Sequence, residues 1–147
     1  MKNKTSATVT LWVNRCILVL LAVLCIFLYD LLVWYRTLRQ LPWQVCAAIM
    51  AGFYLCVPAI LLALLSMEKL LATVLKQEIF ITANVRRIRR IRWCCAWVSI
   101  VCLISGVMYP PLLFLALIMA FLALVVGVVK NVIAAAVELR EENDLTI

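Results

Sequence analysis

The sequence predicts an all-α fold, a polytopic membrane four-helix bundle, and two observations carry this prediction. Hydrophobic residues make up 68% of the 147 residues, against roughly 45–50% in soluble domains. Residues 41–67 and 93–129 contain no Asp, Glu, Lys or Arg, and residues 16–35 contain only Asp30. A soluble fold of this length cannot bury so much unbroken apolar sequence, whereas a lipid bilayer solvates it.

Four membrane spans are expected in a single domain. About 20 apolar residues cross the hydrocarbon core as a helix, which places spans at about residues 16–35, 45–65, 93–108 and 112–130. The last two are separate because Tyr109-Pro110-Pro111 interrupts a stretch that is too long for one crossing, and proline disfavours helix at and before its position. The alternative is three spans with a re-entrant piece after the prolines.

The basic residues predict the orientation, because Lys and Arg in short loops are retained in the cytoplasm. With four spans, twelve of the fourteen Lys and Arg residues fall on one side, and only Arg36 and Arg39 fall on the other. Both termini, the segment 66–92 and the tail 131–147 are therefore expected in the cytoplasm.

The segment 66–92 is expected to be an amphipathic and basic helical connection in two pieces. Apolar residues at positions 67, 70, 71, 74 and 75 follow a helical pattern, which extends the second span or lies along the membrane. Residues 77–81 are expected to be a loop, and Thr82 to cap the next helix. That helix carries the arginine cluster, which consists of Arg86, Arg87, Arg89, Arg90 and Arg92.

Three interpretations of the arginine cluster stay open. It fixes the topology and binds anionic headgroups of membrane lipids, it docks an acidic protein or the chain's own tail, or it binds nucleic acid. Nucleic acid fits worst, because the patch is short, lacks a recognition fold and lies against repelling headgroups. In the tail, Glu141, Glu142 and Asp144 could pair with the arginines, although exposed pairs contribute only about 0–1 kcal/mol each.

Asp30 is the one ionisable side chain well inside a predicted span, which makes it a candidate polar site. It lies about 22 Å along the helix from Arg15, near the outer interface, so a structural or interfacial role is expected ahead of a proton or ion site. The seven cysteines lack metal-ligand spacing and there is no His, so no metal and no cofactor are expected. Without paired carboxylates or a nucleophile–base set, no enzymatic activity is expected.

Small side chains recur along one side of the fourth predicted span, at Ala116, Ala120, Ala123 and Gly127. Helices in lipid gain little from apolar burial, so their close contacts depend on small residues. This face is expected to contact another helix, either within the monomer or in a second copy of the chain.

Residues 66–147 resemble a family of small bacterial four-helix integral membrane proteins that carries only a domain-of-unknown-function label. The specific parts are Glu78-Ile79-Phe80, the run Asn84-Val85-Arg86-Arg87-Ile88-Arg89-Arg90-Ile91 and the closing Leu139-Arg140-Glu141-Glu142-Asn143-Asp144-Leu145-Thr146-Ile147. Members are often encoded beside small helix-turn-helix transcription regulators, so the resemblance implies a partner of such a regulator in the bacterial cytoplasmic (inner) membrane. The family has no established catalytic residue, and none is carried over.

Together these patterns predict a regulatory or scaffolding protein that presents the segment 66–92 and the tail 131–147 to a cytoplasmic protein. The candidate partner- or lipid-binding residues are Asn84, Arg86, Arg87, Arg89, Arg90, Arg92, Glu141, Glu142 and Asp144. The alternative is a small transporter or channel subunit, in which Asp30 and the outer helix ends line a path. A polar cavity from Asp30 would favour transport, and a cleft beside the arginine helix would favour regulation.

Overall fold

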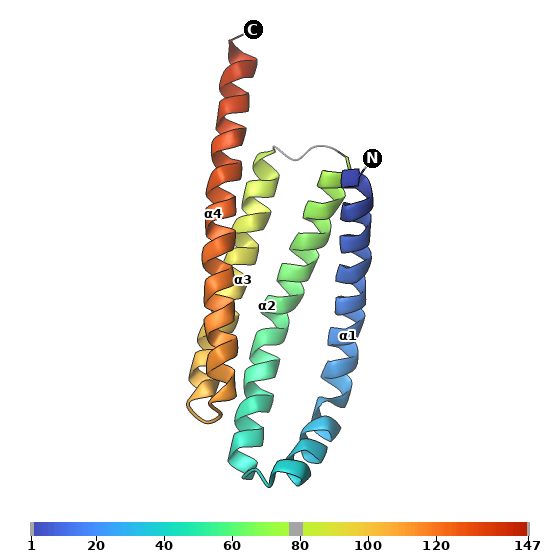
Figure 1. Ribbon diagram of the computed structural model, residues 1–147, viewed down its shortest axis with the longest axis vertical. Helices are drawn as coiled ribbons and strands as arrows, with labels where there is room; N and C mark the ends of the chain where they lie inside the picture. Colours follow the sequence, from blue (N-terminus) through green and yellow to red (C-terminus); the bar gives the residue numbers. More distant parts are fainter. Residues whose placement is uncertain (1, 77–80, 147) are drawn as a thin grey trace.

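The computed structural model describes residues 2–76 and 81–146, which form four antiparallel helices (Figure 1). Their bounds are α1 Lys2–Arg39, α2 Trp43–Leu75, α3 Thr82–Gly106 and α4 Pro111–Leu145. The described part of the chain contains no strand. The predicted all-α bundle is therefore confirmed.

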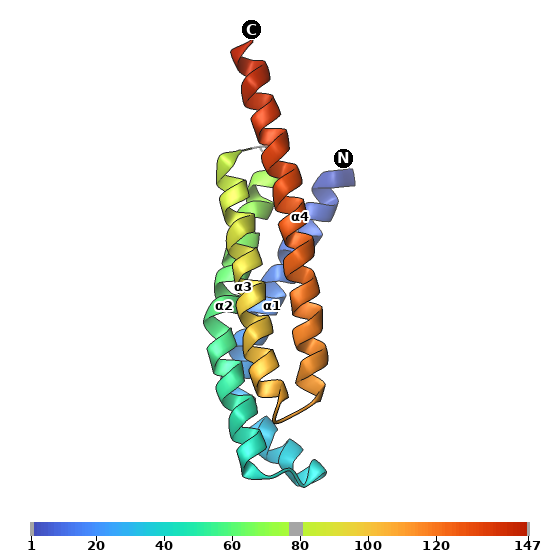
Figure 2. The same cartoon turned by 90° about the vertical axis from the view of Figure 1, so that its left-hand side faces the viewer.

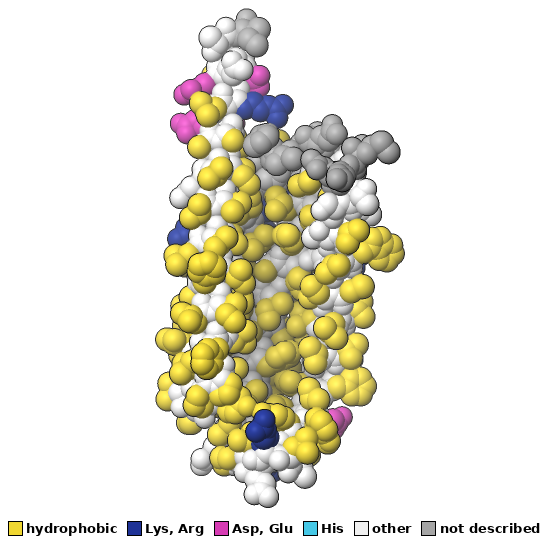
Figure 3. Space-filling model, viewed as in Figure 1, with side chains coloured by type: hydrophobic (Ala, Val, Ile, Leu, Met, Phe, Trp, Pro, Cys, Tyr) yellow, Lys and Arg dark blue, Asp and Glu magenta, His cyan; other side chains and the backbone are white. Residues whose placement is uncertain are grey.

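The helices pack in the order of the sequence, α1 against α2, α2 against α3 and α3 against α4. In Figure 1, α1 and α4 lie on opposite sides of the α2–α3 pair, and Figure 2 shows the same pair behind and beside α4. The bundle is thus open along one side, where Figure 3 shows a shallow hollow lined by hydrophobic side chains. We call the end where α2 ends and α3 begins the basic end, and the opposite end, with residues 40–42 and 107–110, the turn end.

Three described helices are long and apolar enough to cross a membrane, namely Thr5–Arg39, Trp43–Leu75 and Pro111–Leu145. Large hydrophobic side chains cover the outer surface of these helices (Figure 3), which is typical of a membrane protein and rare on a soluble one. α3 is less apolar because arginines fill its first turns. It nevertheless returns the chain from the basic end to the turn end, where α4 begins (Figure 1), so four crossings remain our prediction.

The helices extend beyond the predicted spans. α1 begins at Lys2, the amphipathic stretch 67–76 continues α2 as far as Leu75, and α4 runs on to Leu145. No Gly or Pro interrupts these flanking stretches, so the helical hydrogen bonds propagate past the apolar part.

The prediction that Thr82 caps α3 is wrong. Ile81 holds the N-cap position, with extended backbone (φ −127°, ψ 144°) and no side-chain cap. The amide of Asn84 donates to the carbonyl of Ile81 at 2.9 Å, which starts the helical turn one residue earlier than predicted. Of the expected loop 77–81, Ile81 is non-helical, and residues 77–80 lie outside the described residues.

α1 contacts α2 through a narrow stripe. Its buried residues Ala7, Asn14, Leu21 and Leu28 recur every seven positions, and Leu32 follows. A seven-residue repeat of this kind is the seam of a left-handed helix pair. Asp30 lies off the stripe and is exposed.

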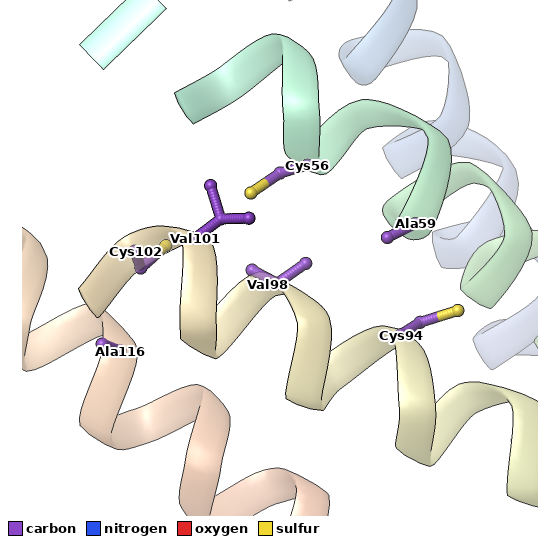
Figure 4. Packing of buried hydrophobic residues seen from close by; sticks show 7 residues of the cluster. All are labelled: Cys56, Ala59, Cys94, Val98, Val101, Cys102 and Ala116. Atoms are coloured by element: carbon purple, nitrogen blue, oxygen red, sulfur yellow. The ribbon is translucent and has the colours of Figure 1, made fainter. Parts of the chain in front are cut away.

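Small apolar side chains and thiols fill the interior between α2, α3 and α4. The buried cluster consists of Cys56, Ala59, Cys94, Val98, Val101, Cys102 and Ala116 (Figure 4). Figure 4 shows the Cys56 side chain directed from α2 towards α3. The thiols are free and act as small hydrophobic groups.

The small-residue face of α4 packs within the chain. Ala116 is 1% exposed, and its carbonyl accepts a hydrogen bond from Ser99 Oγ at 2.8 Å. The side chain of Arg92 lies over Gly127, where an added Cβ would meet its Nε at 3.3 Å. This face therefore holds α4 against α3 within the monomer.

Gly52 allows α2 to lie close to α3 at Ser105, and we predict the effect of replacing it on stability. A Cβ at Gly52 would lie 2.6 Å from Ser105 Oγ but 3.5 Å from Ser105 Cβ. Gly52→Ala is expected to destabilise the protein by about 1–3 kcal/mol, as overpacking does, and adding Ser105→Ala should recover most of this because the clash is with the hydroxyl. Thermal unfolding in detergent measures both variants. A double variant no more stable than the single one would contradict this packing.

Candidate docking surface at the basic end

A buried polar cluster joins α2 to α3 at the basic end. Asn84 is 1% exposed and is the largest fully buried side chain among the described residues. Its Oδ1 accepts hydrogen bonds from Thr73 Oγ1 at 3.0 Å and from Arg87 Nη1 at 3.0 Å. Arg87 Nη1 also donates to the carbonyl of Lys69 at 3.0 Å. This bonding fixes the start of α3 against the last turns of α2.

α1 is tied to α2 at the same end. Asn14, which is buried, donates from Nδ2 to the carbonyl of Leu64 at 3.2 Å. The next residue of α1, Arg15, places its Nε 3.1 Å from Oε1 of Glu68, which lies one turn beyond Leu64 on α2. This ion pair is largely exposed, so it contributes only about 0–1 kcal/mol. Together these contacts fix the ends of α1, α2 and α3 relative to one another at the basic end.

The structure divides the arginine cluster among different sides of α3. Arg87 turns towards α2 through the bonds to Asn84 and Lys69, and Arg92 reaches across to α4 over Gly127. Arg90 lines a hollow between α2 and α3 on the outer surface. These arginines therefore do not form one continuous patch.

The positions of the other two arginines, Arg86 and Arg89, can be inferred from helix geometry. Arg86 lies four residues before Arg90, and Arg89 lies three residues before Arg92, so each shares a side of the helix with its pair. Both side chains are exposed. Arg90 thus faces the outer surface beside α2 and Arg92 faces the side of α4, with Arg86 and Arg89 on the exposed side between them.

The tail acids lie away from the arginines. Glu141, Glu142 and Asp144 are exposed on the part of α4 that projects past the other helices (Figures 1 and 2). Within residues 2–76 and 81–146, the one ion pair is between Arg15 and Glu68, so the structure does not bring the tail and the arginine cluster together.

The register between α3 and α4 explains this separation. Arg92 lies beside Gly127, so in an antiparallel pair Thr82, the first residue of α3, is level with Val137. Val137 is also the last buried residue of α4. Glu141 follows four residues later, hence about 6 Å beyond the start of α3. The acids therefore stand clear of the arginine helix.

Hydrophobic side chains accompany these acids. Leu139 is 66% exposed and Leu145 is 88% exposed. Both lie beyond Val137, where α4 has left its contact with α3. The projecting segment 138–145 is therefore an acidic helix that carries two uncovered leucines.

Asp30 is not brought to any polar site. It is exposed on α1, and no described residue forms an ion pair or hydrogen bond with it that would build a site. A cavity of about 250 Å³ lies between α2, α3 and α4, and its lining residues, such as Phe53, Val98 and Leu115, are mainly apolar. Asp30 is not among them, so the polar path that would favour transport is not observed in the described residues.

A separate contact closes the turn end. The hydroxyls of Tyr35 and Tyr109 lie 2.6 Å apart and join α1 to the turn between α3 and α4. This hydrogen bond raises the pKa of Tyr109. Beside it, the guanidinium carbon of Arg36 lies 5.5 Å from the ring centroid of Trp43, a cation–π contact.

A family model described as "Protein of unknown function (DUF2975)" matches residues 7–147. The chain belongs to the DUF2975 family. The match confirms the resemblance to a family of unknown function and extends it from residues 66–147 to the first two helices. No curated protein and no solved structure matches the chain.

In this DUF2975 protein, two of the segments that carried the resemblance lie at the basic end. The run 84–91 forms the first turns of α3, with Asn84 buried as the centre of the polar cluster. The segment 139–145 forms the projecting end of α4. The third segment, 78–80, lies outside the described residues.

Sequence reasoning missed Thr73, Asn14 and Glu68 as members of the basic end. A threonine in an amphipathic helix gives no sign that its hydroxyl will meet Asn84. Asn14 did carry a signal, because it falls on the seven-residue repeat of buried positions between Ala7 and Leu21. A polar residue in such a seam specifies register, and here it bonds the backbone of α2.

Proposed function

We propose that this DUF2975 protein is a non-enzymatic membrane regulator or scaffold that docks a cytoplasmic protein at its basic end. In this proposal it lies in the bacterial cytoplasmic membrane, with both termini and the basic end inside. The orientation is supported by the charge distribution, since basic loops stay in the cytoplasm. The docking role is supported by one observation above all, the projecting segment 138–145.

The projecting segment has the properties of a docking helix. Short helices without packing partners are marginal in water, so a surface that covers Leu139 and Leu145 would stabilise it. Helix-in-groove recognition uses such apolar anchors on an otherwise polar helix. The acids around them favour a groove with a basic rim.

A helix-turn-helix transcription regulator fits this description of the partner. Such proteins carry basic surfaces for the DNA backbone, and Glu141, Glu142 and Asp144 offer the complementary charge. Docking there would compete with DNA for the same basic surface. The membrane protein would thereby hold the regulator away from its operator.

The experiment is recovery of the partner from cells with the intact protein in mild detergent. Neutralising the tail with Glu141→Gln, Glu142→Gln and Asp144→Asn is expected to reduce recovery about tenfold or more, with the largest effect at low ionic strength. Helix packing should not change, because all three side chains are exposed.

The control removes two positive charges at the turn end, with Arg36→Gln and Arg39→Gln, away from the projecting segment 138–145. Its recovery of the partner should equal that of the unmodified protein. Equal recovery with the neutralised tail would contradict the proposal. The transport alternative rests on Asp30, and since no observation in the described residues favours it, we do not propose it.

A further inference from the structure

A hollow of about 460 Å³ lies on the outer surface between the middle parts of α2 and α3. Pro58, Leu62, Trp93, Trp97 and Ile100 line it together with Arg90. Its volume is in the range of small-molecule sites, roughly 300–1,000 Å³. Apart from this one guanidinium, the hollow is an apolar surface.

The charged group stands at one end of the hollow. Arg90 lies towards the start of α3, and Ile100 lies ten residues further along the helix. Ten residues rise about 15 Å, which is half of a hydrocarbon core about 30 Å thick. The hollow therefore has the length of one leaflet, with the cation at the headgroup end.

The cation is available to an anion. No hydrogen bond or ion pair joins Arg90 or Arg86 to another of the described residues, whereas Arg87 is bound to Asn84 and to the carbonyl of Lys69. Arg86 lies one turn before Arg90 on the same side of α3. Two guanidiniums thus stand together above the apolar hollow, and guanidinium is well matched to phosphate oxygens.

The indole of Trp97 is fixed in place. Its Nε1 donates to the carbonyl of Leu55 on α2 at 3.3 Å, so its polar atom is used within the protein and its ring forms a wall of the hollow. Trp93 is 70% exposed one turn nearer the basic end. Tryptophan at this depth is typical of the membrane interface.

We propose that this hollow binds one anionic glycerophospholipid from the leaflet at the basic end. The phosphate lies against Arg90 and Arg86, and one acyl chain lies along Trp93, Trp97 and Ile100. General attraction of the arginine cluster to anionic membranes would not distinguish these residues from Arg92. A lipid bound there would lie on the outer side of α3, away from α4. It would leave the projecting segment 138–145 uncovered. This site does not depend on the proposed docking of a protein.

The test is lipid binding by the purified, delipidated full-length protein in detergent, followed by native mass spectrometry. Phosphatidylglycerol and phosphatidylcholine with identical acyl chains are added as the two probes. The unmodified protein is expected to bind phosphatidylglycerol at least about tenfold more tightly, because each basic residue contributes to anionic lipid binding. Arg86→Gln with Arg90→Gln should remove most of that preference.

Two controls distinguish lipid binding at this hollow from general attraction between basic residues and anionic lipid. Arg36→Gln with Arg39→Gln makes the same charge change at the turn end, and Arg92→Gln makes a single change on the α4 side of the same helix. Both should keep the preference for phosphatidylglycerol. Equal losses in the Arg86/Arg90 variant and in these controls would overturn the proposal, as would the absence of any preference in the unmodified protein.

A second variant tests the acyl-chain half of the site. Ala96 lines the hollow, and Ala96→Leu fills part of it without changing charge. We expect binding of phosphatidylglycerol to weaken about threefold or more while the unfolding temperature without lipid stays unchanged. Unaltered binding in this variant would show that no chain lies in the hollow and would overturn the assignment.

Discussion

Leu139→Gln with Leu145→Gln is expected to weaken binding of the cytoplasmic partner by about a hundredfold or more. Both leucines are exposed in the free protein, at 66% and 88%, so the substitutions leave its own packing intact. Burying one leucine against a partner is worth roughly 1.5–3 kcal/mol, and every 1.4 kcal/mol is about a tenfold change in affinity. The affinity of the protein in nanodiscs for the purified partner measures the effect.

The control for this variant places the same kind of change at the turn end. Leu38 and Met108 are also exposed large hydrophobic residues, so Leu38→Gln with Met108→Gln matches the number of apolar groups removed. Its affinity for the partner should be that of the unmodified protein. A loss of the same size in both variants would mean that the projecting segment 138–145 is not the docking helix.

Asn84→Ala is expected to be the most destabilising single substitution at the basic end. It removes the acceptor shared by Thr73 and Arg87 at a fully buried position, and losing these hydrogen bonds, one of them to a charged group, costs about 1–3 kcal/mol. For a chain of this size each kcal/mol lowers the unfolding temperature by roughly 2–4 °C. Thermal unfolding in detergent measures this loss.

Two further substitutions test whether the loss of stability comes from the hydrogen bonds of the Asn84 side chain. Asn84→Asp keeps the acceptor oxygen and adds a charge that attracts Arg87, so it should be more stable than Asn84→Ala. Thr82→Ala should have little effect, because the hydroxyl of Thr82 does not cap the helix. A large loss in Thr82→Ala, or no loss in Asn84→Ala, would contradict the polar cluster as described.

The helices themselves could be predicted because uncharged stretches and a Tyr-Pro-Pro interruption are local signals. The start of α1 could not, since residues 2–15 are polar enough for a loop but contain no Gly or Pro to stop a helix. The continuation of α4 beyond residue 130 could be predicted, because residues 132–137 are all apolar. That Ala116, Ala123 and Gly127 pack against a helix could be predicted from their spacing. Which helix they contact depends on the tertiary arrangement.

The sequence predicted which candidate residues share one helix, but it did not predict the hydrogen bonds that they form. The sequence placed Arg87 and Asn84 in one basic helix, but nothing local indicated that Asn84 is buried against Thr73. Pairing between the tail acids and the arginines was expected from opposite charge alone. The contact of Arg92 with Gly127 sets a register between α3 and α4 in which Glu141 lies beyond α3. The charges in the sequence do not predict this register.

In our two proposals, the projecting segment and the hollow beside Arg90 face different solvents. Arg90 faces the outer side of α3 beside Trp93, with Arg86 one turn before it, where our proposal places lipid headgroups. Leu139 and Leu145 stand beyond the last contact between α4 and α3, where the docking proposal places them in the cytoplasm. Their exposure there is the feature that a soluble partner would remove.

The most direct test of the account is photocrosslinking in living cells, with a photoreactive amino acid at position 139 and, separately, at position 108. Leu139 lies on the projecting segment and Met108 lies in the opposite turn. We predict that position 139 crosslinks one soluble cytoplasmic protein and that position 108 does not. If position 139 captures no cytoplasmic protein, or if both positions capture the same one, the basic end is not a cytoplasmic docking surface.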